Sequence, residues 1–385
     1  MNGKTSGWDP DRLDHLTAVI EDDLRKDRYL GAVIKVARHG EIGIEMAFGH
    51  ADEARQKPLT LNSVFSIFSV TKAITNVLVF RAIERGDLAL TTKVSDVIPE
   101  FGGGLRQHIT VFDLLTHASG LPSVFTPRPG MNIDNLDEII KAIVENVHAI
   151  EAPQVRVDYS PLAHHALLGE MVRRTDPKGR RYRDIVQQEL FDPLKMASSS
   201  IGRRADLKDR HAIPEFRGNA PTEHRSARVE GQNGAFEDPD AEMPWVGAVC
   251  STPDLFRLAE MLRRGGELDG VRILSPAIIE LATRNWTGDK PNELYKTLAN
   301  RRGWNPYPAY MGLGFAVRGP GVHHAIYGTL CSPQTYGNYG AGTALFWVDP
   351  VRGVTFAFLS AGVMNGGDNI ERFQRLGDIV TSAAI

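Results

Sequence analysis

Cysteine is scarce in this sequence: the 385 residues include only two, Cys250 and Cys331. Two cysteines cannot build a disulfide framework or a four-cysteine zinc site, so we expect both to be buried as small apolar side chains. The adjacent residues His323 and His324 have no carboxylate or cysteine at metal-ligand spacing. We therefore expect no metal site. The glycines match neither nucleotide-binding loop pattern, so we expect no cofactor either.

The sequence also lacks an excess of basic residues and any long apolar run. Its 44 Lys and Arg and 47 Asp and Glu give a formal net charge of -3, which argues against a dedicated nucleic-acid-binding protein. No segment approaches the roughly 18 apolar residues of a membrane-spanning helix. The polar, acidic first twenty residues do not resemble a signal peptide. We expect a cytoplasmic protein that contacts neither nucleic acid nor membrane.

Strand patterns occur near both ends of the chain, and helix patterns dominate its middle. The predicted strands cover residues 32–38, 41–49, 312–318, 344–349 and 353–360. We predict an α/β fold of the α+β type, in which both termini build one antiparallel sheet flanked by helices. This sheet domain is discontinuous, over residues 1–87 and 241–385, and a mainly helical lobe, residues 88–240, is inserted into it. A cleft between the two is a natural pocket.

Apolar spacing and turn residues predict the helices. They cover residues 9–26, 68–86, 109–115, 136–147, 164–174, 182–191, 252–266 and 369–380. Gly86 suits the left-handed residue that ends a helix. Residues 219–242 form a predicted long loop with several acidic residues, which is either simply solvated or a lid over a pocket.

Ser69 and Lys72 are the first candidate catalytic residues. They are three positions apart at the start of a predicted helix, so their side chains share one face. A desolvated lysine can activate a serine as a nucleophile, and the helix N-terminus favours negative charge there. This short pattern is also compatible with an ordinary helix that begins at a capping serine.

Two further segments carry groups that suit this chemistry. Tyr159 precedes a predicted helix, where its phenol could act as a general base or simply pack at the surface. The glycine-rich segment 336–343 leads into a strand, and its backbone could approach a ligand and donate an oxyanion-hole N–H. The alternative is a simple hairpin bulge.

Several histidines and tryptophans could serve the site or only the fold. His164 and His165 begin a helix beside Tyr159; they could contact a leaving group, but a polar helix start explains them as well. For His117 we favour a structural contact. Trp245 and Trp304 could line an acyl pocket or pack in the core.

Taken together and in order, these segments resemble the serine β-lactamase-like superfamily. The superfamily includes class C β-lactamases, DD-peptidases and, as the most similar branch, family VIII carboxylesterases. The resemblance spans nearly the whole chain. Its motifs are FSIFSVTKAITNVLVFRAIERGDLAL around Ser69, VSDVIPEF (94–101), ITVFDLLTHASGLP (109–122), YSPLAHHALLGEMV after Asp158, LFDPLKM (190–196), GAVCSTPDLFRLAEML (247–262) and NYGAGTALFWVDP (338–350).

This resemblance implies a role for each matching residue. Ser69 would be the acylated nucleophile, Lys72 would hold and activate it, and Tyr159 would be the general base. The backbone N–H groups of Ser69 and Ala341 would form the oxyanion hole. The third motif of the family, a Lys/His-Thr/Ser-Gly or Trp-Gly-Gly triplet that binds substrate, falls on Asn338, Tyr339 and Gly340.

The chain departs from the family at two positions. Only Gly340 of the third motif is retained, and Pro161 stands where the family's tyrosine motif often has Asn. A β-lactamase uses those side chains to hold the lactam carboxylate and amide, so a neutral Asn338 and a proline argue against efficient β-lactam turnover. The expected absence of a signal peptide also favours a cytoplasmic esterase.

The sequence therefore predicts a serine hydrolase that cleaves small carboxylic esters through an acyl-enzyme on Ser69. The G-x-S-x-G pattern of α/β-hydrolases does not occur. One alternative is a relative directed at amides, such as a β-lactamase or D-aminopeptidase, or an acyltransferase. Another is a non-catalytic binding protein that keeps the fold. The sequence does not indicate the oligomeric state.

Overall fold

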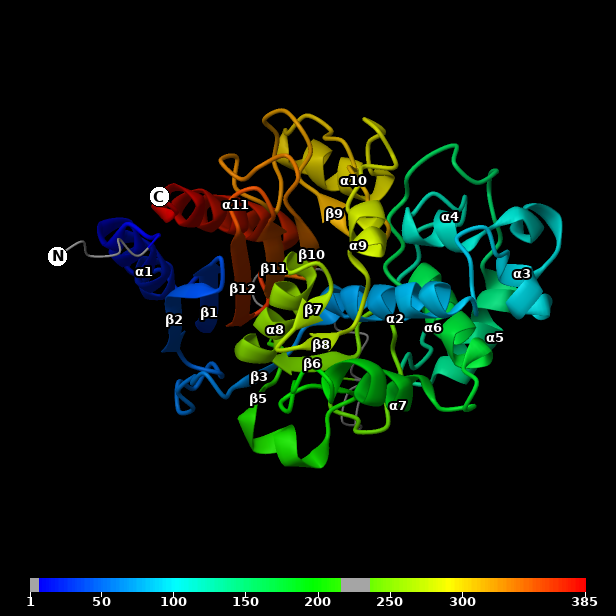
Figure 1. Cartoon of the computed structure of the whole chain (residues 1–385), viewed down its shortest axis with the longest axis horizontal. Coiled ribbons are helices and arrows are strands. Elements are labelled where there is room, and N and C mark those ends of the chain that lie inside the picture. The colour runs from blue at the N-terminus through cyan, green and yellow to red at the C-terminus, as the bar shows by residue number, and fades with distance from the viewer. Residues whose placement is uncertain (1–6, 216–235) are drawn as a thin grey trace.

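The computed structural model describes residues 7–215 and 236–385. Its largest sheet has six antiparallel strands in the order β2-β1-β12-β11-β10-β9. The first two strands come from the N-terminal part of the chain and the other four from the C-terminal part (Figure 1). Their bounds are β1 Gly31–Arg38, β2 Glu41–Gly49, β9 Ala316–Val317, β10 Tyr336–Gly340, β11 Ala344–Asp349 and β12 Val354–Ala361. The predicted antiparallel sheet built from both termini is confirmed.

Helices cover the two faces of this sheet. On one face, α1 (Pro10–Arg25) and α11 (Gly366–Ala383) pack side by side over the apolar side chains of the central strands. On the other face lie α8 (Thr252–Arg263) and α2 (Thr71–Arg85). Figure 1 shows α2 between the sheet and the helical part of the molecule. This central position explains why most of α2, polar residues included, is buried.

The inserted part of the chain is mainly helical. Its α-helices are α3 Val94–Val97, α4 Val111–Leu115, α5 Leu136–Asn146, α6 Ala163–Thr175 and α7 Tyr182–Val186. The segment also supplies β4 (Ser200–Ile201) and β5 (His211–Ala212), which join β3 (Val64–Ser66) and β6 (Ala248–Ser251) in a second, four-stranded sheet. The boundaries at residues 88 and 240 stay a prediction.

Residues 264–310 differ most from the prediction. They contain the hairpin β7 (Glu267–Leu268) and β8 (Val271–Arg272) and two helices, α9 (Pro276–Ala282) and α10 (Glu293–Arg302), which the apolar pattern did not indicate. The strand expected over residues 312–318 is also wrong in extent, because only Ala316–Val317 pairs as β9. Gly312 and Gly314 lie in a tight turn, where the Gly312 N–H donates to the Phe315 carbonyl.

Residues 216–235, which hold most of the predicted loop or lid, lie outside the described residues. Within the part that is described, no helix is long and apolar enough to cross a membrane. The same residues contain no group of three or more His, Cys, Asp or Glu side chains that could hold a metal ion. Cys250 and Cys331 are both buried and unpaired.

Candidate active site

Ser69 lies in a one-turn 3-10 helix, η1 (Phe68–Val70), which connects β3 directly to α2. The preceding residue, Phe68, has a φ of 45°, a strained conformation for a bulky side chain. Its buried ring packs edge-on against Phe236 at 5.0 Å, which helps to hold this conformation. The turn directs the serine into a cavity instead of into the core around α2.

Lys72 lies below Ser69 on the first turn of α2 and is only 1% exposed. Its Nζ is 3.1 Å from Oγ of Ser69 and donates to the carbonyls of Pro161 (2.9 Å) and Trp245 (3.1 Å). Burial lowers the pKa of Lys72 well below its usual value. A neutral amine has two N–H donors and one lone pair, so the two carbonyls take its donors and leave the lone pair for the Ser69 hydroxyl.

Tyr159 approaches Ser69 from the loop that precedes α6. Its backbone is fixed on both sides, because its N–H donates to Oδ1 of Asn292 and its carbonyl accepts from Ser123. Its ring centroid lies 5.1 Å from Nζ of Lys72. Burial raises the pKa of Tyr159, and a side-chain hydrogen bond with Ser69 opposes this rise only in part. The resting group is therefore a neutral phenol beside the serine.

Three buried histidines lie behind Tyr159. The His117 ring packs on the Tyr159 ring at 4.6 Å, and its Nδ1 accepts from the Ser160 N–H and lies 2.9 Å from Nδ1 of His164. The third imidazole, His165, forms a hydrogen bond through its Nε2 to Oδ1 of Asn76. Burial lowers the pKa of all three imidazoles, that of His164 to about 3. None of the three lines the cavity that contains Ser69.

Strand β10 brings the glycine-rich segment against the Ser69 turn. A Cβ at Gly340 would lie 2.2 Å from the Ile67 carbonyl oxygen, so only glycine allows this approach. Tyr339 and Ala341 line the same cavity as Ser69. Asn338 points away from it: its Nδ2 donates to the Gly314 carbonyl (2.9 Å), and it lines a second cavity. The structure thus brings the predicted segments together.

The cavity above Ser69 has a volume of about 380 Å³ and mostly apolar walls. Trp245 lines it, whereas Trp304 stacks on His324 outside it. Sequence reasoning missed the wall that α10 supplies, because the polar sequence of this helix has no clear apolar periodicity. Besides Tyr159, Pro161, Tyr339 and Ala341, the apolar and aromatic residues around the cavity are Phe68, Phe125, Ile133, Phe236, Trp245, Val246, Leu294, Tyr295, Leu298 and Met364.

Two curated proteins illustrate what the chain is similar to. "Esterase/beta-lactamase LipL" of Mycobacterium tuberculosis is 25% identical over 359 residues, which cover 86% of this chain and 77% of that protein. "Esterase EstB" of Burkholderia gladioli is 43% identical over 110 residues, or 28% of each chain.

Solved structures show the same fold. A penicillin-binding protein homologue from Caulobacter crescentus superposes with a TM-score of 0.78 at 26% identity, over 97% of this chain and 98% of that one. A family VIII carboxylesterase superposes with a TM-score of 0.76 at 19% identity, over 97% of each chain. The Beta-lactamase family model matches residues 16–381. The resemblance seen in the sequence is thus confirmed, and the chain belongs to the Beta-lactamase family of serine hydrolases.

Proposed function

We propose that this protein is a serine carboxylesterase that forms an acyl-enzyme on Ser69. One observation carries the proposal: the Ser69 hydroxyl lies 3.1 Å from a fully buried lysine amine whose other contacts are two carbonyl oxygens. A serine needs an adjacent base to attack an ester, and this amine is available as that base because burial disfavours its charged form.

Acylation begins when the Lys72 amine takes the proton of the Ser69 hydroxyl and Ser69 Oγ attacks the ester carbonyl carbon. Tyr159 then gives its hydroxyl proton to the leaving alcohol oxygen, and Lys72 restores the proton to Tyr159. The family resemblance implies Tyr159 as the general base. We instead assign the first proton acceptor to Lys72, because its amine lies 3.1 Å from the Ser69 hydroxyl and burial raises the pKa of the Tyr159 phenol. In the second half of the reaction, water attacks the carbonyl carbon of the acyl-enzyme and Ser69 Oγ is the leaving group. Tyr159 and Lys72 carry out the same proton transfers in reverse order, and the acid is released.

The negative oxygen that forms during attack needs donors that are already in place. We assign this role to the backbone N–H groups of Ser69 and Ala341, which lie on the two segments that Gly340 allows to approach. Loss of one such donor typically costs about 100- to 1,000-fold in turnover, so the spacing between β10 and the Ser69 turn matters for rate.

Two features support an ester over a β-lactam substrate. Asn338 replaces the positively charged or imidazole residue of the third motif, and Pro161 offers a backbone carbonyl, already bonded to Lys72, in place of an amide side chain. One similar protein, EstB, is named an esterase, whereas the name of LipL includes both esterase and beta-lactamase. We also propose that the substrate is a small-molecule ester and that the protein is cytoplasmic.

The test compares the protein with Ser69→Ala on p-nitrophenyl butanoate, a chromogenic cephalosporin and a D-alanyl anilide. We expect the ester to be the best substrate and Ser69→Ala to remove its turnover, whereas the control Ser95→Ala in α3 retains it. Mass spectrometry should find a butanoyl group on Ser69.

Two results would contradict the proposal. A preference for the cephalosporin or the anilide would favour an amide-directed relative. Failure of a fluorophosphonate to label Ser69 would favour a non-catalytic binding protein.

A further inference from the structure

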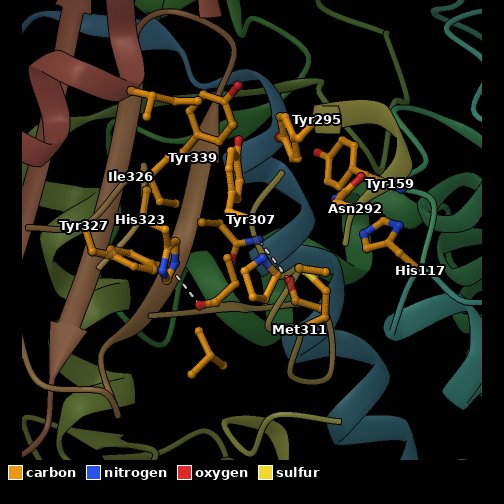
Figure 2. Close-up of a pocket in the computed structure, with 18 residues that line it drawn as sticks. His117, Tyr159, Asn292, Tyr295, Tyr307, Met311, His323, Ile326, Tyr327 and Tyr339 are labelled. Carbon is orange, nitrogen blue, oxygen red and sulfur yellow. Dashed lines mark hydrogen bonds between the residues drawn. The ribbon is translucent and has the colours of Figure 1, made fainter. Parts of the chain in front are cut away.

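A second cavity lies on the other side of Tyr159. It has a volume of about 90 Å³ and shares Tyr159, Tyr295 and Tyr339 with the cavity above Ser69. Figure 2 shows Tyr159 and Tyr295 facing each other at one end of this cavity, with Tyr307 and His323 along its wall. None of the described residues that line it is Asp, Glu, Lys or Arg. The cavity is therefore uncharged, aromatic and adjacent to the proposed proton donor.

Asn338 supplies an unused hydrogen-bond acceptor in the wall of this cavity. Its side chain is 9% exposed, and its Nδ2 donates to the Gly314 carbonyl, which fixes which way the amide faces. The remaining Oδ1 has no hydrogen-bond partner among the described residues. A buried acceptor without a donor is destabilising, so such atoms usually serve a ligand or a water molecule. The group that completes this site must donate a hydrogen bond.

The positions of the two cavities assign one half of an ester to each. Ser69 and the apolar side chains line the larger cavity, which suits the acyl chain. Tyr159, which gives its proton to the leaving oxygen in the proposed mechanism, lines both. The alcohol half begins at that oxygen, and the smaller cavity is a second space beside the same tyrosine.

We propose that the smaller cavity binds the alcohol half of the substrate and that this alcohol carries a second hydroxyl group, which donates to Oδ1 of Asn338. This inference rests on the proposed esterase function and names its substrate class: fatty acyl esters of short diols. The reaction stays balanced, because the acyl group passes to Ser69 and the diol leaves with the proton from Tyr159. A volume of about 90 Å³ leaves room for a short alcohol group but not for a long chain.

The test uses two butanoate esters whose alcohols have the same number of non-hydrogen atoms, the 2-hydroxyethyl ester and the propyl ester. We expect kcat/KM to be about fivefold higher for the hydroxyethyl ester, the effect of one net hydrogen bond. Asn338→Leu removes the acceptor at similar volume and should bring the ratio of the two values close to one. Asn62→Leu, the same change at an exposed turn, should keep the wild-type ratio.

Equal kcat/KM values in the wild-type protein, or a ratio that survives Asn338→Leu, would overturn the inference. p-Nitrophenyl butanoate has no second hydroxyl, so its hydrolysis by the wild-type protein reports on the esterase function separately. If that ester is not cleaved, the proposed function itself fails.

A measurement without variants covers the case in which Asn338→Leu does not fold. Ethylene glycol should capture the butanoyl-enzyme more often than propanol at equal concentration, beyond the factor of two that its two hydroxyls allow. Equal capture per hydroxyl would also overturn the inference.

Discussion

Lowering the pH from 7 to 5 should destabilise the fold through four buried histidines. His117, His164, His165 and His211 are each at most 2% exposed. Burial lowers the pKa of His164 and His211 to about 3, and it lowers the pKa of the other two well below the usual value. His164 and His211 therefore stay neutral in the folded protein at pH 5, and burial moves the pKa of His117 and His165 in the same direction.

The unfolded chain behaves differently, because a solvated imidazole has a pKa of about 6.5. Between pH 7 and pH 5 the unfolded state takes up protons that the folded state does not, so the free energy of unfolding falls with pH. His164 and His211, whose pKa in the folded protein is about 3, each contribute about 2 kcal/mol to this fall over the two pH units. Together these two groups amount to about 4 kcal/mol, and His117 and His165 add to the fall in the same direction. The total is a large part of the stability of an ordinary domain, about 5–15 kcal/mol.

Urea unfolding followed by circular dichroism at pH 7 and pH 5 measures this difference. His165→Gln can keep a hydrogen bond to Asn76 but does not titrate, so its loss of stability over the same interval should be smaller than that of the wild type. His15→Gln, on the exposed side of α1, is the control and should behave like the wild type. The reasoning is refuted if the free energy of unfolding is equal at the two pH values, or if His165→Gln loses as much as the wild type.

Two further predictions concern catalysis and packing at the site. Lys72→Arg should lower kcat/KM for p-nitrophenyl butanoate about 100- to 10,000-fold, because a guanidinium does not accept the Ser69 proton; a normal acylation burst would contradict this. Gly340→Ala places a Cβ 2.2 Å from the Ile67 carbonyl oxygen, so it should cost about 1–3 kcal/mol in urea unfolding and slow acylation. Wild-type stability and burst rate in Gly340→Ala would show that β10 and the Ser69 turn need not lie this close.

The elements that carry the motifs could be predicted because their signals are local. Ser69 and Lys72 are three residues apart on one helix, and Gly86 ends that helix with a φ of 82°, as its position in the sequence indicates. The hairpin of β1 and β2 follows from two segments rich in strand-forming residues around a His39–Gly40 turn. In each case the residues that decide the structure are neighbours in the chain.

The walls of the two cavities could not be predicted, because distant contacts decide them. The alternating residues 312–318 are typical of a strand, but Gly314, with a φ of 73°, lies so close to Asn76 that a Cβ would be 2.3 Å from its side-chain amide. Helix α10 is largely polar, and its Tyr295 and Leu298 line the cavity only because the fold places this helix over Ser69. Similarly, nothing in the sequence shows that His117 meets His164 behind Tyr159.

The lack of charge around Ser69 connects the proposed mechanism to the proposed ester substrate. Lys72 can act as a neutral amine because its described contacts are carbonyl and hydroxyl oxygens, and a nearby carboxylate would instead favour its protonated form. Among the described residues that line the larger cavity, Arg301 is the one charged side chain, and it is exposed. A substrate carboxylate would therefore lose its hydration beside Ser69 without gaining a buried cation. An uncharged ester avoids that cost, so in the proposed mechanism the burial that would make Lys72 a base would also select against the carboxylate that a β-lactam carries.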